Sequence, residues 1–186
     1  MYHQNLCRES FWLGLFDEKF TVISLKRIRQ QMIRRTIESD HAALIELAHA
    51  SGLFEAEQTE LLADMLSSSA EDDIWFTDDD GAAPVGVAYM APEKMTNGTW
   101  NLYWIAVHPD RQRQGRGKAM LSHVQQWLLD RGERVLLVET AGTDDFDYVR
   151  KFYADNGFEN EARIRDFYDA GVDKVVFRKS IVRNDA

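Results

Sequence analysis

The stretch that decides the fold of this chain is NLYWIAVHPDRQRQGRGK, residues 101–118. Its first half, from Leu102 to Val107, is an uncharged run of large side chains, which is typical of a strand buried on both faces. Pro109 ends this strand, because proline cannot donate a hydrogen bond to a sheet ladder. The pattern therefore predicts a buried strand that runs directly into a loop.

The second half of the stretch is a loop with two glycines that leads into a helix. Apolar residues recur with helical spacing after the loop, at Met120, Leu121, Val124, Trp127 and Leu128. Gly115 and Gly117 allow a tight turn and let a ligand approach main-chain N–H groups closely. The first N–H groups of a helix lack partners within it, and the helix dipole favours negative charge there. With Arg113, Arg116 and Lys118 around the same point, the loop predicts a pyrophosphate site.

Two commoner phosphate-binding loops are excluded by their residues. A Walker loop needs glycine where Gln112 stands, and serine or threonine where Ala119 follows the lysine. A dinucleotide fingerprint that starts at Gly115 needs glycine where Met120 stands. The remaining pattern is Gln-x-x-Gly-x-Gly after a strand that ends in AVHP. This pattern resembles the acyl-CoA loop of the GCN5-related N-acetyltransferases, and closely that of their RimI-like members.

The resemblance covers residues 32–181 and implies an α/β fold. We expect a mixed, mostly antiparallel twisted sheet with helices on both faces, whose parallel central strands, 101–107 and 135–140, splay apart beyond Val107. The splay would free strand-edge groups to pair with the pantetheine arm of CoA. The implied CoA-binding residues are Ile105, Ala106, Val107, Gln112, Arg113, Gln114, Gly115, Arg116, Gly117 and Lys118. The alternative for this loop is a glycine-containing surface turn with solvated arginines.

A second motif, FYADNGF at residues 152–158, stands where the family places a tyrosine pattern. The resemblance implies that the Tyr153 hydroxyl points at the CoA sulfur and protonates the departing thiolate. From the residues of this motif alone, Phe152 and Tyr153 are better interpreted as core aromatics of an amphipathic helix. Related members often carry asparagine seven residues before the tyrosine, where Phe146 stands here. The contact that this asparagine makes to pantetheine is therefore missing, or is supplied by a residue such as Thr140 or Thr143.

Glu139 directly follows the apolar run 135–138, and its position resembles that of the catalytic base in RimI-like enzymes. Its spacing to Tyr153 is longer than in those enzymes. A structural or solvated Glu139, with deprotonation relayed by water, stays open. The ending of the chain also resembles a branch of bacterial family members, and Asp166, Tyr168 and Asp173 are further candidates for the lining of the acceptor cleft.

Composition and charge narrow the possible partners. The one cysteine, Cys7, excludes an intramolecular disulfide and a cysteine-based metal cluster, and it fits a reducing, cytoplasmic compartment. The five histidines lack the tight spacing of metal ligands, so no metal is expected. A formal net charge of −9 disfavours nucleic acid as a partner and suits a cationic substrate. The apolar patch at residues 11–16 is too short to span a membrane.

Residues 1–31 are expected to form an N-terminal extension, either poorly ordered or a short docking helix, ahead of an acetyltransferase domain at 32–186. Within the domain we expect helices at 41–50, 57–67 and 146–155, the first capped by Ser39 or Asp40. The segment Asp78-Asp79-Asp80-Gly81 reads as a hairpin turn. The resemblance implies that the helix pair at 41–50 and 57–67 and its connection at 51–57 border the acceptor site. A last hairpin is expected from strands at 158–168 and 173–181.

These patterns predict an acetyl-CoA-dependent N-acetyltransferase that acts on a small-molecule or peptide amine. The alternative is a catalytically silent module that binds CoA or a protein, and the formation of a homodimer stays open. At the loop we expect Gly115→Ala or Gly117→Ala to weaken CoA binding more than Arg116→Ala, on the premise that Arg116 is a surface side chain whose attraction is screened by solvent.

Overall fold

The computed structural model describes residues 31–52, 56–68, 70 and 72–182, so the predicted extension at 1–31 lies almost wholly outside the described residues. The helices are α1 (His41–Ala50), α2 (Thr59–Ser67), α3 (Arg116–Asp130) and α4 (Asp147–Asp155). The strands are β1 (Met32–Arg35), β2 (Ile74–Asp79), β3 (Pro84–Pro92), β4 (Thr99–Val107), β5 (Val135–Ala141), β6 (Glu159–Asp169) and β7 (Val172–Ser180). None of the described helices is long and apolar enough to cross a membrane.

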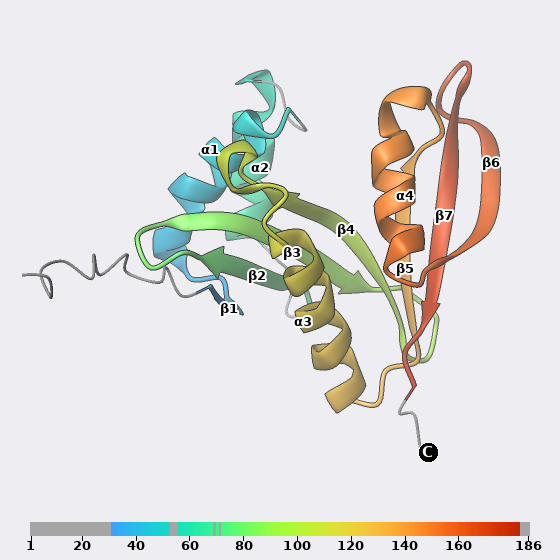
Figure 1. The fold of residues 1–186 in the computed structure, drawn as a ribbon, viewed down its shortest axis with the longest axis horizontal. Coiled ribbons are helices and arrows are strands. Elements are labelled where there is room, and N and C mark those ends of the chain that lie inside the picture. The colour runs from blue at the N-terminus through green and yellow to red at the C-terminus, as the bar shows by residue number, and fades with distance from the viewer. Residues whose placement is uncertain (1–30, 53–55, 69, 71, 183–186) are drawn as a thin grey trace, which may run out of the picture.

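The strands form one seven-stranded sheet in the order β1-β2-β3-β4-β5-β7-β6. All neighbouring strands are antiparallel except β4 and β5, which are parallel and joined through α3. Helices cover both faces, with α1 and α2 on one side and α3 and α4 on the other (Figure 1). The predicted fold class is confirmed, including the parallel central pair.

The central strands separate earlier than the sequence predicted. Their last paired residues are Leu102 and Val138, so the expectation that they diverge only beyond Val107 was wrong. Tyr103 is the reason, because it is an extra residue on β4: Tyr89 pairs with Trp104, whereas the next residue of β3 pairs with Leu102. Such a bulge bends its strand and increases the local twist. Figure 1 shows β4 and β5 side by side at one end and apart at the other.

Two apolar clusters hold the helices on the sheet. The larger cluster packs α3 and α4 against the sheet and contains Met120, Leu121, Leu136, Val138 and Phe177. The smaller cluster packs α1 and α2 on the other face and contains Leu44, Leu47, Leu62, Trp75 and Trp104. Side chains that alternate along β2, β3 and β4 contribute to both clusters, as expected for strands covered on both faces, whereas the buried residues of β5 belong to the larger cluster.

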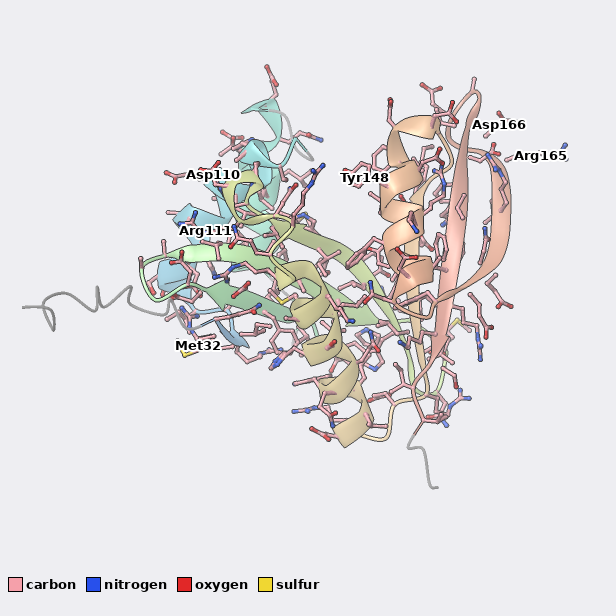
Figure 2. All side chains as sticks on the ribbon, viewed as in Figure 1. Met32, Asp110, Arg111, Tyr148, Arg165 and Asp166 are labelled. Atoms are coloured by element: carbon pink, nitrogen blue, oxygen red, sulfur yellow. The ribbon has the colours of Figure 1, made fainter. Side chains whose placement is uncertain are left out.

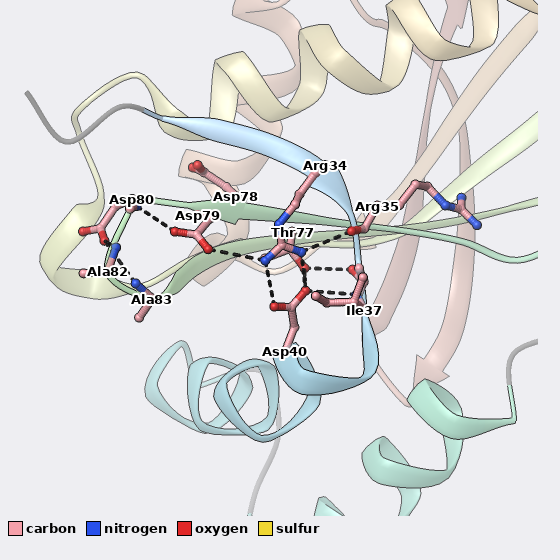
Figure 3. A network of polar contacts seen from close by, with 12 residues as sticks. Arg34, Arg35, Ile37, Asp40, Thr77, Asp78, Asp79, Asp80, Ala82 and Ala83 are labelled. Carbon is pink, nitrogen blue, oxygen red and sulfur yellow. Dashed lines mark hydrogen bonds and ion pairs between the residues drawn. The ribbon is translucent and has the colours of Figure 1, made fainter.

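The ends of β1 and β2 carry a polar network that the sequence did not predict (Figure 3). Asp40 precedes α1 but makes no side-chain capping bond to it. Its carboxylate instead accepts hydrogen bonds from Arg34, from the Thr77 hydroxyl and from the Ile37 N–H. The expected cap is therefore replaced by a connection between β1, β2 and the start of α1.

Candidate functional site

The loop at residues 111–117, called the glycine loop below, has two residues in the left-handed region. Gly115 has φ 80° and directly precedes α3, whereas Arg113 has φ 57°, which is uncommon for a residue with a side chain. The side chains of Gln112 and Gln114 donate hydrogen bonds to the carbonyls of Val107 at 3.0 Å and Asp110 at 3.2 Å. The loop thus presents the first N–H groups of a 15-residue helix, which is the geometry of an anion site.

The positive charge at the glycine loop differs from the prediction. Arg116 is not a surface arginine: it is 7% exposed, and its Nη1 donates to both carboxylate oxygens of Asp78 at 2.8 and 2.9 Å. Arg111, labelled beside Asp110 in Figure 2, donates from Nε to Asp80 at 3.1 Å. The exposed basic side chains of the loop region are those of Arg113 and Lys118. Only these two of the predicted cations therefore extend into solvent.

The edges of β4 and β5 diverge before β4 reaches the glycine loop. Beyond Leu102 and Val138, main-chain groups on the facing edges no longer pair with each other. Thr140, just past the last pair on β5, has a buried hydroxyl without a hydrogen-bond partner. A Cβ at Gly117 would lie 3.6 Å from the Phe152 ring, so no steric conflict within the protein requires glycine there. These features suit an amide-rich ligand that passes close to the start of α3.

Tyr153 lies over the point at which the central strands separate. Its ring packs 5.7 Å from Phe177, centroid to centroid, and Phe177 pairs with Val138, the last residue of β5 that pairs with β4. Phe152 and Phe158 pack against the same ring at 5.4 and 5.5 Å. The side chain is 4% exposed, and burial raises the pKa of its hydroxyl above the ordinary value. Tyr153 is therefore both a core aromatic and a protonated hydroxyl near the separation.

Glu139 is the first residue of β5 beyond the segment that pairs with β4. Successive side chains of a strand point to opposite faces, so Glu139 lies on the face opposite to Val138 and Tyr153. Its carboxylate accepts a hydrogen bond from Lys174 at 2.9 Å, and this lysine also lies 3.6 Å from the centre of the Phe167 ring. Glu139 thus belongs to an ion pair at the strand separation, and it is neither buried in the core nor fully solvated.

Aromatic and acidic residues surround Glu139 on its side of the sheet. We call this surface the Glu139 face, defined by Glu93, Asn101, Tyr103, Glu139 and Tyr168. The Glu93 carboxylate accepts from the Asn101 amide at 3.1 Å and from the Tyr103 hydroxyl at 3.3 Å. Burial, together with Glu93 and Glu139, raises the pKa of Tyr103, while burial and Glu139 raise that of Tyr168.

Sequence reasoning missed most of this face, because its members come from separate strands. Of the predicted cleft residues, Tyr168 lies near Glu139, whereas Asp166 and Asp173 have local partners. Asp173 accepts from Arg163 at 2.5 Å, and Asp166 accepts from the Gly171 N–H at 2.7 Å. Figure 2 shows Asp166 beside Arg165 at the outer edge of β6. These two aspartates therefore shape the β6–β7 hairpin.

Comparison with known proteins agrees with this geometry. The acetyltransferase (GNAT) domain model matches residues 70–160. A structure from Desulfovibrio desulfuricans, assigned to the GNAT acetyltransferases, is 30% identical and superposes with a TM-score of 0.77 over 82% of this chain and 99% of that one. No match was found among curated proteins.

Two more distant structures share the fold. The ribosomal-protein-S18-alanine N-acetyltransferase from Escherichia coli is 24% identical, with a TM-score of 0.68 over 82% of this chain and 95% of that one. An aminoglycoside 6'-N-acetyltransferase complexed with coenzyme A is 14% identical, with a TM-score of 0.68 over 83% of this chain and 99% of that one. The chain belongs to the family of GCN5-related N-acetyltransferases and is an acetyl-CoA-dependent N-acetyltransferase.

Proposed function

We propose that the glycine loop binds the pyrophosphate of acetyl-CoA and that the diverging edges of β4 and β5 bind its pantetheine arm. The left-handed residues Arg113 and Gly115 at the start of α3 support the first placement. The early end of the β4–β5 ladder and the unpartnered Thr140 hydroxyl support the second. Thr140 takes the role of the asparagine that this chain lacks at Phe146. The observation that carries the proposal is the early separation of β4 from β5, with the glycine loop after the end of β4 and Tyr153 of α4 over the separation.

In this placement Tyr153 is the general acid and Glu139 assists the removal of a proton from the amine. Acetyl-CoA supplies an activated thioester, and an alkyl amine arrives as ammonium because its pKa is about 10.4. The raised pKa keeps Tyr153 protonated near neutral pH, so its hydroxyl can hydrogen-bond to the sulfur as negative charge develops. Glu139 lies on the other face of β5, at the same separation, and can accept the amine's proton directly or through water.

We propose that the Glu139 face binds a cationic acceptor. Glu93 and Glu139 place negative charge beside Tyr103 and Tyr168, and aromatic faces also attract ammonium groups. Tyr103 is 53% exposed, so it is accessible to an incoming molecule. A primary amine with a second positive charge would satisfy both carboxylates, whether it is a small molecule or a peptide.

The test is a measurement of thiol release from acetyl-CoA with a panel of matched amines. Mono-, di- and triamines of similar size, an amino sugar and a peptide amine would be compared at neutral pH. We expect kcat/KM to rise with the number of positive charges and to fall with added salt, because exposed charge attraction is screened. Equal kcat/KM for mono-, di- and triamines would contradict the cationic acceptor. Binding of CoA without turnover of any amine would instead favour a silent CoA-binding module.

A further inference from the structure

Three consecutive aspartates stand at the end of strand β2 and directly after it, and their side chains make contacts on two different faces. Asp79 lies on the α1 side, where it accepts a hydrogen bond from Arg34 at 3.4 Å. Asp78 extends from the opposite side of the strand, away from Asp40 and α1 (Figure 3). This alternation is the normal period of a strand. It separates one aspartate that connects to β1 from two that meet the glycine loop.

Asp78 and Asp80 hold the glycine loop from its two ends. Asp80, which is 2% exposed, binds Arg111 at the beginning of the loop. Asp78, which is 0% exposed, binds Arg116 at the end of the loop, in the first turn of α3. The Asp80 carboxylate is fixed in turn by the N–H groups of Ala82 and Ala83. Both anchors therefore come from the β2–β3 hairpin.

The loop between these anchors has a conformation that needs support. Arg113 is in the left-handed region, which costs free energy for a residue with a side chain and persists only when the surroundings impose it. An anion site made of main-chain N–H groups works only while these groups converge. Because residues 112–115 lie between the two anchored arginines, the ion pairs to Asp78 and Asp80 restrict the loop to few conformations.

We propose that Asp78 and Asp80 are positioning residues for acetyl-CoA, which hold the glycine loop in its anion-binding shape through Arg116 and Arg111. This inference rests on the proposed binding of the pyrophosphate at that loop. It makes the two arginines structural: their charge is neutralised by aspartate, and the phosphates are bound by main-chain groups. If the arginines instead contacted phosphate directly, removal of the aspartates would free them and would increase the affinity for CoA.

The experiment compares Asp80→Asn and Asp78→Asn with Asp79→Asn, a matched control from the same strand end that also loses an ion pair. We expect Asp80→Asn and Asp78→Asn to weaken CoA binding about tenfold, as for a loop that is competent in only a tenth of molecules. kcat at saturating acetyl-CoA should stay within about twofold, because bound cofactor restores the loop. Asp79→Asn should leave the Kd for CoA unchanged. Trypsin cleavage after Arg113, measured without CoA, should accelerate only in the first two variants.

Other outcomes would overturn the inference. Tighter CoA binding by Asp80→Asn would show that the freed Arg111 contacts phosphate. Equal weakening by Asp79→Asn would show that general loosening of the sheet is responsible. If Asp78→Asn does not fold, Asp80→Asn decides alone, since Asp80 lies in the turn and its partner is partly exposed. The trypsin measurement needs no ligand, so it tests the positioning role of Asp78 and Asp80 independently of CoA. Failure of the proposed CoA placement would instead be seen as wild-type protein that does not bind CoA.

Discussion

The glycine loop and the Glu139 face are built in different ways. The loop is one contiguous segment that presents main-chain groups, and two of its arginines are occupied by buried aspartates. The Glu139 face is assembled from side chains on β4, β5, β6 and the residue after β3, and several of them are partly exposed. A site made of main-chain groups changes little when side chains are substituted, so it suits a co-substrate that stays the same. A site made of exposed side chains can change its acceptor by substitution, so changes at the two regions should have separable effects.

The largest expected effect is that of Tyr153→Phe, at the boundary between the two regions. We expect kcat to fall about 10²-fold, at the low end of general acid catalysis, because a thiolate is already a tolerable leaving group. The acetyl-CoA KM should change little, since the ring still packs against Phe177. The loss should be smallest at low pH, where solvent supplies the proton.

Tyr148→Phe is the matched control for this change, because Tyr148 is an exposed tyrosine on the same helix (Figure 2). Its kinetics should equal those of the wild type. Unchanged kcat across the pH range in Tyr153→Phe would reduce Tyr153 to a core aromatic, while the proposed CoA site, which rests on other residues, would stand.

The next largest effect is expected at Gly117. Gly117 is inside α3 without a positive φ, and the added Cβ would make only ordinary contacts. Gly117→Ala should therefore leave the protein as stable or up to about 1 kcal/mol more stable, through the better helix propensity of alanine. CoA affinity should nevertheless fall about tenfold, if the ligand passes where the Cβ would stand. Urea unfolding and calorimetric titration measure the two quantities.

Gly132→Ala serves as a control, because it should lower stability and leave CoA affinity unchanged. Gly132 follows α3 with φ 74°, a conformation that alanine adopts poorly. We expect it to lose about 1 kcal/mol of stability with no change in CoA affinity. A Gly117→Ala protein that binds CoA normally would mean that the ligand does not approach this turn.

A third change tests Asp40, which belongs neither to the glycine loop nor to the Glu139 face. Burial alone would raise the pKa of Asp40, but hydrogen bonds from Arg34, the Ile37 N–H and Thr77 outweigh it and hold the pKa below the ordinary value. A carboxyl with a lowered pKa in the folded state stabilises the fold above the unfolded pKa, near 3.9, and this contribution is lost as pH falls through the folded pKa. Unfolding free energy should drop by about 1 kcal/mol in this range from Asp40 alone.

Asp40→Asn should flatten this part of the pH profile while lowering stability at pH 6. The measurement is urea unfolding from pH 6 to pH 2.5. A variant with the wild-type slope below pH 4 would show that Asp40 does not contribute to acid sensitivity.

The smallest expected effect is at the Glu139 face. Glu93→Gln should raise the KM of a cationic acceptor about threefold, as expected for a partly exposed charge, without altering CoA affinity. Glu46→Gln, which removes an exposed charge from α1, serves as the control for net charge. A shift in CoA affinity with Glu93→Gln would show that the two regions are not separate.

The sequence predicted the fold and the loop because both have local signals. The apolar run 102–107, the Asp-Gly turn and the Gln-x-x-Gly-x-Gly pattern each fix a conformation within a few residues. The connection 53–55 beside the predicted acceptor site lies outside the described residues. The assignments of Tyr153 and Glu139 stay predictions, now with a common location at the strand separation.

What the sequence could not predict depends on long-range partners. Asp78 and Asp80 read as turn residues, and nothing local showed that Arg111 and Arg116 would reach them across the sheet. The bulge at Tyr103 has no glycine to indicate it, so the strands were expected to separate too late. The one available signal was the spacing of two aspartates at i and i+2, the first on β2 and the second just past its end, together with a loop that carries several arginines.

The most direct test of the account is a backbone amide NMR titration of the full chain with CoA. Binding at the glycine loop and along the strand edges predicts the largest shifts at the N–H groups of residues 112–118, then at 103–107 and 139–141. The resonances of Glu93 and Asn101 should respond only when a cationic amine is added afterwards. CoA that binds without moving the resonances of residues 112–118 would contradict the assignment of the cofactor site, and with it the division into two regions.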